Sequence, residues 1–268
     1  MTERSASGNM RIKITLLTTL LLAFSSIGFA QSNKSQQLRR FTPQMQSDEQ
    51  NSGQERVRVF VEKGIAQSTV QALSKYASQQ YESAQMRLGL YRLPGADSLY
   101  FVTVMFDDPT LQDTTLPPTT LFILKEQGGT VSELRKSTYN DPNNGDINRV
   151  LEPVFFLGQS KLLIIVSAAL IDGFITNYVF EYAGDDLKSL DEIHVIENVS
   201  ENGVYTGSYN PMRQATAEYK NNSYYVTMRG KKSLFNGEKK IAPPGKPITF
   251  FYDGKTWRQA GKKQRRRR

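Results

Sequence analysis

Residues 161–182 read KLLIIVSAALIDGFITNYVFEY, and this stretch decides the fold. Two apolar runs flank Asp172-Gly173, and such a pair is a strong signal for a β-hairpin with a two-residue type I′ turn. A strand with apolar side chains on both of its faces has other parts of the protein packed against both faces. We therefore place the hairpin in the middle block of the fold. One face carries Leu162, Ile164, Val166 and Ala168, and the other carries Leu163, Ile165 and Ala169.

The hairpin is the middle pair of a four-stranded pattern that recurs three times. Short apolar strands alternate with turn residues in blocks at 86–138, 153–196 and 215–259, which begin 62 to 67 residues apart. We expect a mainly β fold of antiparallel four-stranded meanders. Meanders repeated around an axis would make propeller-like blades, although three blocks are fewer than the usual minimum of about four blades. The alternative is a non-repeating sandwich, barrel or α+β sheet.

One amphipathic helix precedes the meanders. Residues 57–61 alternate as a strand, and residues 66–86 place Val70, Leu73, Ala77, Tyr81 and Ala84 at helical spacing, with Ser68 as an N-cap. We treat 57–98 as a strand-helix-strand segment and 99–260 as the β-rich domain. A second interpretation joins the strands at 57–61 and 86–92 through the helix as a parallel βαβ unit.

The chain begins with a leader. Residues 10–30 combine a basic start, an apolar core and the small residues Gly28 and Ala30 before a cleavage point, as in a secretory signal peptide. We therefore assign 1–30 as signal peptide, with Met10 as a candidate true start, and expect no integral membrane span after cleavage. An uncleaved anchor is the alternative. Residues 31–56, rich in Gln, Ser and Asn, are expected to be a disordered lead-in.

The positive charge of the chain is concentrated at its end. Residues 31–261 carry 25 basic and 25 acidic side chains, whereas the tail at 261–268 adds six cations without an acidic residue. Such a cluster binds polyanions through counterion release. The alternative is a solvated end without function. The polyanion-binding candidates are Lys262, Lys263, Arg265, Arg266, Arg267 and Arg268.

Motifs for metal and cofactor binding are weak. The chain has no cysteine, and no glycine-rich nucleotide signature occurs, so we predict no cofactor. The loop NDPNNGDIN at 140–148 resembles a calcium loop in composition, but its glycine is one position out of the EF-hand register. An ordinary polar loop is the alternative. The calcium candidates are Asp141, Asn143, Asp146 and Asn148.

No catalytic residue is assigned. His194 is the only histidine and is expected at the surface, because Ile193 and Val195 on either side are apolar. Acidic pairs at 107–108, 185–186 and 191–192 could serve glycoside hydrolysis, but their position at strand ends is typical of turns. Several tyrosines in the last third could stack on sugars or bases, or pack in the core: Tyr205, Tyr209, Tyr219, Tyr224, Tyr225 and Tyr252.

These patterns favour an exported, periplasmic or secreted protein that acts as a non-catalytic binding or structural module of the cell envelope or extracellular space. Its partner would be a protein or a glycan. One alternative is a carboxylate-based glycan-active enzyme with a propeller-like cleft. The other is a polyanion binder that uses the basic C-terminal tail.

Overall fold

The computed structural model describes residues 35–46, 50–51, 57–81, 85–106, 119–139, 152–169, 175–201, 204–209, 211–236 and 239–261. This part of the chain is mainly β, with sheets of six, five, five and four strands. The three larger sheets contain the three predicted meanders, and we number them sheets 1, 2 and 3 in chain order. Within the described residues, no helix has both the length and the apolar character needed to cross a membrane.

Sheet 1 combines the first meander with a parallel βαβ unit. Strand β4 (Val57–Val61) runs parallel to β5 (Met86–Arg92), and α2 (Gln67–Gln79) connects them, so the βαβ interpretation is confirmed. The division between 57–98 and 99–260 falls inside this sheet, because β5 pairs with β4 on one side and β6 on the other. The order is β3-β4-β5-β6-β7-β8, with β3 (Gln50–Asn51), β6 (Leu99–Phe106), β7 (Thr119–Gln127) and β8 (Thr130–Tyr139).

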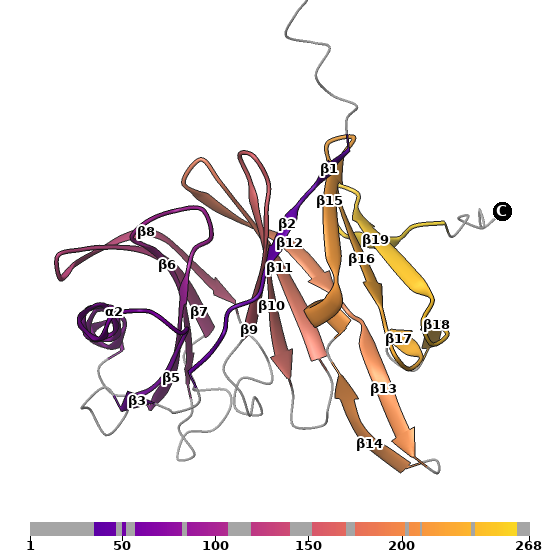
Figure 1. Cartoon of the computed structure of the whole chain (residues 1–268), viewed down its shortest axis with the longest axis horizontal. Helices are drawn as coiled ribbons and strands as arrows, with labels where there is room; N and C mark the ends of the chain where they lie inside the picture. Colours follow the sequence, from indigo (N-terminus) through magenta and orange to yellow (C-terminus); the bar gives the residue numbers. More distant parts are fainter. Residues whose placement is uncertain are drawn as a thin grey trace, which may run out of the picture.

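Helix α2 covers the outer face of sheet 1 (Figure 1). Its buried residues include the predicted Val70, Leu73 and Ala77, which pack against β4 and β5. The helix is shorter than predicted, and Ser68 is not its N-cap. Ala66 occupies that position without a side-chain hydrogen bond, so packing of the apolar face, rather than a cap, stabilises the helix.

Sheet 2 is the middle layer and is buried on both faces, as the sequence predicts. Leu162, Ile164 and Val166 pack against sheet 1. Leu163 and Ile165 pack against sheet 3. The strand order is β12-β11-β10-β9-β2, with β12 (Asp186–Ile193), β11 (Ile175–Ala183), β10 (Leu162–Ala169), β9 (Glu152–Leu157) and β2 (Arg39–Phe41).

The β10–β11 hairpin is confirmed, and its pairing runs from Leu162 with Tyr182 to Ala169 with Ile175. The two-residue turn at Asp172-Gly173 stays a prediction. Asp172 and Gly173 themselves lie outside the described residues, as do the side chains of Ala168 and Ala169.

Sheet 3 contains the third meander, with one predicted strand divided in two. The apolar run at 224–235 bends at Gly230, where an added Cβ would lie 2.6 Å from Leu234 Cδ2 and 2.8 Å from the Lys232 oxygen. This tight bend ends the strand, so only its first half stays in the sheet. The order is β1-β15-β16-β19-β20, with β1 (Gln36–Gln37), β15 (Thr216–Lys220), β16 (Ser223–Arg229), β19 (Pro247–Tyr252) and β20 (Trp257–Gln259).

A small fourth sheet is built from segments that leave sheets 2 and 3. The chain turns at His194 and Val195 after sheet 2 and forms the first two strands of the fourth sheet. The short 3-10 helix η3 (Pro211–Gln214) then leads into sheet 3. After Gly230 the chain returns to the fourth sheet and forms its other two strands. The order is β14-β13-β17-β18, with β14 (Val204–Tyr209), β13 (Ile196–Glu201), β17 (Leu234–Asn236) and β18 (Lys239–Ala242).

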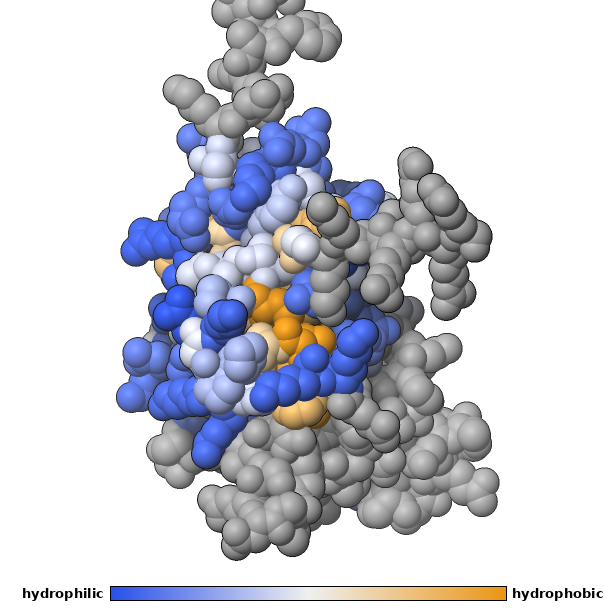
Figure 2. All heavy atoms as spheres, turned by 90° about the vertical axis from the view of Figure 1, so that its right-hand side faces the viewer, coloured by the Kyte–Doolittle hydropathy of each residue, from blue (hydrophilic) through white to orange (hydrophobic). Residues whose placement is uncertain are grey.

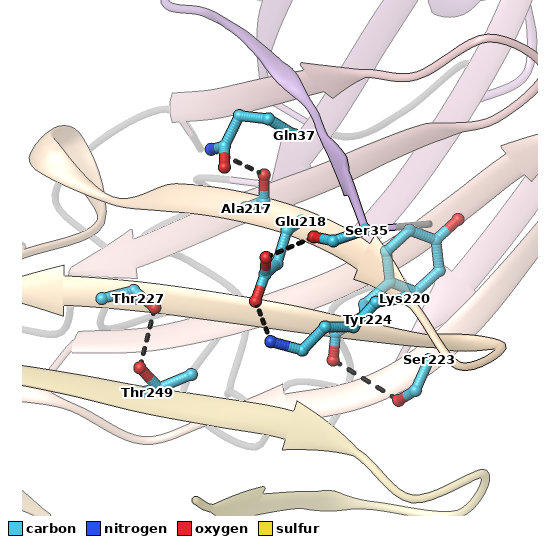
Figure 3. A network of polar contacts seen from close by, with 9 residues as sticks. All are labelled: Ser35, Gln37, Ala217, Glu218, Lys220, Ser223, Tyr224, Thr227 and Thr249. Carbon is cyan, nitrogen blue, oxygen red and sulfur yellow. Dashed lines mark hydrogen bonds and ion pairs between the residues drawn. The ribbon is translucent and has the colours of Figure 1, made fainter. Parts of the chain in front are cut away.

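The described residues 35–46 and 50–51, which we call the strap, join the three large sheets. β1 pairs with β15 of sheet 3, β2 with β9 of sheet 2, and β3 with β4 of sheet 1. Leu38, between β1 and β2, is buried, and its N–H donates to the Ala217 oxygen at 2.9 Å. Figure 3 shows Gln37 on the same carbonyl and Ser35 on Glu218. The expectation of disorder is therefore corrected here, because strand edges satisfy the polar backbone.

The meanders are arranged in layers rather than as propeller blades. Helix α2, sheet 1, sheet 2 and sheet 3 follow one another across the molecule (Figure 1), and the described strands close into neither a propeller nor a barrel. The physical reason is that α2 covers the outer face of sheet 1 with residues such as Val70 and Leu73. Sheet 3 therefore has no free apolar face of sheet 1 on which to close a ring.

Candidate functional site

A groove of about 530 Å³ lies where sheets 2 and 3 meet, beside two turns of sheet 3. Sheet 2 contributes charged residues from β11, from β12 and from the residue before β10, and sheet 3 contributes aromatic ones. Residues central to its lining are Lys161, Glu181, Tyr219, Tyr224, Tyr252 and Asp253. The groove is therefore a polar and aromatic site at the end of the interface between two layers.

The two turns fix the rim of the groove. Asn221 and Asn222 have positive φ angles of 49° and 58°, and Lys220 pairs with Ser223, which is the geometry of a two-residue type I′ turn. Asp253 begins the second turn, where its Oδ1 accepts hydrogen bonds of 2.9 Å from two backbone N–H groups. The Ser223 hydroxyl donates to the Tyr252 carbonyl and so connects the two turns.

Three tyrosines form the aromatic wall. Strand alternation places Tyr224 on the face of β16 that packs toward sheet 2, and the ring of Tyr219 lies 4.9 Å from it, centre to centre. Tyr252 contacts Trp257 with ring centres 5.6 Å apart. Tyr224 is buried, whereas Tyr219 and Tyr252 are half-buried and present part of their rings to the groove.

Lys161 and Glu181 form the charged centre of the groove. Lys161 Nζ donates to Glu181 Oε2 at 3.0 Å and to the Tyr219 hydroxyl at 3.3 Å. It also lies 4.7 Å from the centre of the Tyr219 ring, as in a cation–π contact. The Tyr224 hydroxyl donates to the same carboxylate oxygen. These contacts hold the lysine and the carboxylate in fixed positions against the aromatic wall.

The environment of the groove shifts the pKa of three of its groups. Burial raises the pKa of Tyr224, and its hydrogen bond to Glu181 adds to the effect. Burial and then the nearby Asp191 and Asp253 raise the pKa of Tyr252. Burial alone would lower the pKa of Lys161, but hydrogen bonds to Glu181 and Tyr219 outweigh it and raise that pKa. At neutral pH Tyr224 and Tyr252 are therefore neutral and Lys161 is charged.

The carboxylates of the groove are engaged in structural contacts. Asp253 Oδ2 forms an ion pair of 2.5 Å with Arg258 Nε, and the backbone donors of Thr256 and Lys255 lower the pKa of Asp253. Glu181 Oε2 accepts from both Lys161 and Tyr224. The site thus offers fixed hydrogen-bond donors and acceptors beside aromatic rings, an arrangement suited to binding a hydroxyl-rich ligand.

Several residues considered from the sequence lie elsewhere. His194 is exposed as predicted, in the bend between β12 and β13, with its Nε2 3.1 Å from Glu192 Oε2. Asp185 and Asp186 lie at the β11–β12 turn, where Asp185 has a φ of 64°. Neither acidic pair lines the groove. The calcium candidates at 141–148, the pair at 107–108 and the tail cations at 262–268 lie outside the described residues.

Sequence reasoning identified the tyrosines but not the charged pair. Lys161 and Glu181 stand at the ends of two very apolar strands, and both fall on the face of sheet 2 that carries Leu163 and Val179. An isolated charge at the end of an apolar strand was the available signal. Among the described residues, no group of three or more His, Cys, Asp or Glu side chains could hold a metal ion.

The chain was compared with protein-family models, curated proteins and solved structures. None of the three comparisons gives a match. The function of the groove is therefore argued from its own residues.

Proposed function

We propose that the protein is exported and acts as a non-catalytic binding module of the cell envelope or extracellular space, with the groove as its site and a glycan as its ligand. The observation that carries this proposal is the placement of tyrosine rings around the Lys161–Glu181 pair. Export is supported by the leader at 10–30.

A glycan suits both surfaces of the groove. Aromatic side chains present large, rigid apolar faces with a polar tip, and the C–H faces of sugar rings can stack on them. The polar groups have capacity left for sugar hydroxyls. An ammonium carries three donors and Lys161 uses two, while the Tyr219 hydroxyl accepts from Lys161 and keeps its own proton to donate. A volume of about 530 Å³ is in the range of small-molecule sites.

The groove gives less support to the alternative, a carboxylate-based glycan-active enzyme. Glycoside hydrolysis needs one carboxyl group that keeps its proton and a second that acts as base or nucleophile. The lowered pKa of Asp253 keeps this carboxyl ionised, and Glu181 is hydrogen-bonded to a charged lysine. Neither carboxyl therefore has the environment of a general acid.

The test is retention of the purified mature protein, beginning at Gln31, on insoluble polysaccharides. Cellulose, chitin and peptidoglycan are suitable probes. We expect the wild-type protein to sediment with at least one of them, and Tyr219→Ala and Tyr252→Ala to remain in solution. Tyr76→Ala is the matched control, because Tyr76 lies on α2 in the layer farthest from the groove.

Two results would overturn the proposal. One is equal retention of the groove variants and the Tyr76→Ala control, which would place binding outside the groove. The other is release of shortened oligosaccharides by wild-type protein, because a non-catalytic module leaves its ligand intact. Melting temperatures of all variants are measured first, so that loss of binding is separated from loss of fold.

A further inference from the structure

Six cations of the folded part form a cluster at one end of sheet 3 and in the adjoining fourth sheet. Residues 229–246 carry six cations and one acidic residue, Glu238, which lies outside the described residues. The rest of 31–261 carries 19 basic and 24 acidic side chains, so the neutral total conceals a separation of charge. All six cations are exposed, and we call them the basic surface: Arg229, Lys231, Lys232, Lys239, Lys240 and Lys246.

The fold brings these cations together from three segments. Arg229 ends β16 and pairs with Pro247, so it lies beside the loop that carries Lys246. The Gly245 N–H donates to the Gly230 oxygen at 2.8 Å, which holds the bend with Lys231 and Lys232 against the same loop. The β17–β18 hairpin adds Lys239 and Lys240. Figure 2 shows this side of the molecule, where hydrophilic residues surround a small apolar patch.

None of the six cations forms an ion pair with a described residue. Other cations do pair, as in Lys161 with Glu181 and Lys220 with Glu218. One carboxylate does reach the bend: Glu197 is buried and accepts a hydrogen bond from the Lys232 backbone N–H. It is directed to the backbone, so the lysine side chains at the surface remain available to an external anion.

The chain leaves sheet 3 at the same end. The Ala260 N–H donates to the Thr249 oxygen at 2.8 Å, and Thr249 is three residues from Lys246. The seven residues after Gly261 are the six tail cations and Gln264. The basic surface and the start of the tail therefore belong to one end of the molecule.

We propose that the basic surface binds a polyanionic chain, one that carries phosphate or sulfate esters along its length, and that it does so without the tail. Lysines are flexible point charges, which suit repeated anions without fixed geometry. Because the cations come from three separate segments, an extended polymer can contact them in succession. Binding releases counterions and weakens as salt rises. This inference concerns a second ligand and does not depend on the groove.

The test uses protein truncated after Gly261 and heparin as the probe. We expect truncated protein to be retained on a heparin column at low salt. Replacing Lys231, Lys232, Lys239 and Lys240 by Gln in that protein should abolish retention or strongly reduce it. The slope of log affinity against log salt should fall by roughly 3, if each lost contact contributes about 0.7 to 0.9 as with nucleic acids.

The matched control removes four lysines elsewhere, Lys63, Lys75, Lys125 and Lys255, by the same change to Gln. It alters net charge equally, so its retention should stay close to that of truncated protein. Flow-through of the truncated protein, or equal loss in the control, would overturn the proposal. Sedimentation with vesicles rich in phosphatidylglycerol but no retention on heparin would also overturn it and point to a membrane surface. The four-lysine variant should still be retained on the polysaccharide that binds the wild-type protein. This result separates failure of the basic surface from failure of the groove.

Discussion

Trp257 Nε1 donates a 2.7 Å hydrogen bond to the Leu190 carbonyl and so joins sheet 3 directly to sheet 2. Both residues are buried, and the bond closes the interface next to the groove. Replacing Trp257 by Phe should lower the free energy of unfolding by about 1 to 3 kcal/mol, because a buried carbonyl loses its donor. Urea unfolding followed by circular dichroism measures this. The control is Tyr225→Phe, because Tyr225 lies on the face of sheet 3 opposite to the one that carries Trp257. Equal stability of the two variants would contradict the role of the bond.

The strap should contribute strongly to stability through one side chain. Leu38 is 5% exposed and packs between sheets 2 and 3. Leu38→Ala should cost about 2 to 5 kcal/mol, because it removes buried methyl groups and leaves a cavity. Arg39→Ala changes the neighbouring exposed residue and should cost far less. If urea unfolding shows the two variants to be alike, the strap does not pack as described.

Gly89 should tolerate no side chain. An added Cβ would lie 2.5 Å from Thr103 Oγ1 and 2.6 Å from the Tyr91 hydroxyl, both in the interior. Gly89→Ala should therefore destabilise the protein by about 1 to 3 kcal/mol through overpacking. Gly158→Ala is the comparison, since its nearest neighbour would be a leucine methyl group at 3.0 Å that can move. A melting temperature for Gly89→Ala at or above that of Gly158→Ala would refute this.

Stability should fall in alkaline solution because of Tyr224. Its pKa in the folded protein is raised, chiefly by burial, so the folded state keeps a proton that the unfolded state releases above about pH 10. The stabilisation is complete below that pH and is lost as pH rises further. Tyr224→Phe should flatten the decline between about pH 10 and 12, as measured by urea unfolding. Parallel declines in the variant and wild type would count against this linkage.

Two half-buried tyrosines add smaller contributions of the same sign. Burial and a hydrogen bond to a carboxylate raise the pKa of Tyr76 and of Tyr182 to about 12. Absorbance at 295 nm separates the groups, because Tyr76 and Tyr182 ionise while the protein is still folded. Tyr224 should ionise only with unfolding, so tyrosinate formation and loss of circular dichroism should coincide for that residue.

The apolar pattern of the sequence predicted that the middle sheet is covered on both faces. Apolar residues on both faces of 162–166 predicted a strand covered on both sides, and Leu162 and Leu163 indeed face different cores. The meanders were predictable because consecutive antiparallel strands are joined by local turns. Their stacking depends on α2 covering sheet 1, and a helix pattern alone does not say which face it covers.

The strap and the groove were harder to predict because their contacts are distant in sequence. Strand β1 pairs with β15 through backbone groups, and backbone bonding leaves little trace in side-chain composition. Leu38, Phe41 and Met45 were the apolar signals in that polar segment, and Leu38 is the one that is fully buried. The contact of Lys161 with Tyr219 likewise joins residues that only the packing of sheets 2 and 3 brings together.

The most direct test of the groove as a glycan site is the fluorescence of Trp257, the single tryptophan of the chain. Its ring lies 5.6 Å from Tyr252, so occupation of the groove should alter its emission. Titration with cellotetraose, chitotetraose and soluble peptidoglycan fragments should give a saturable change with at least one of them in wild-type protein, and none in Tyr252→Ala. An unchanged spectrum with all three, or the same saturable change in Tyr252→Ala, would contradict the account.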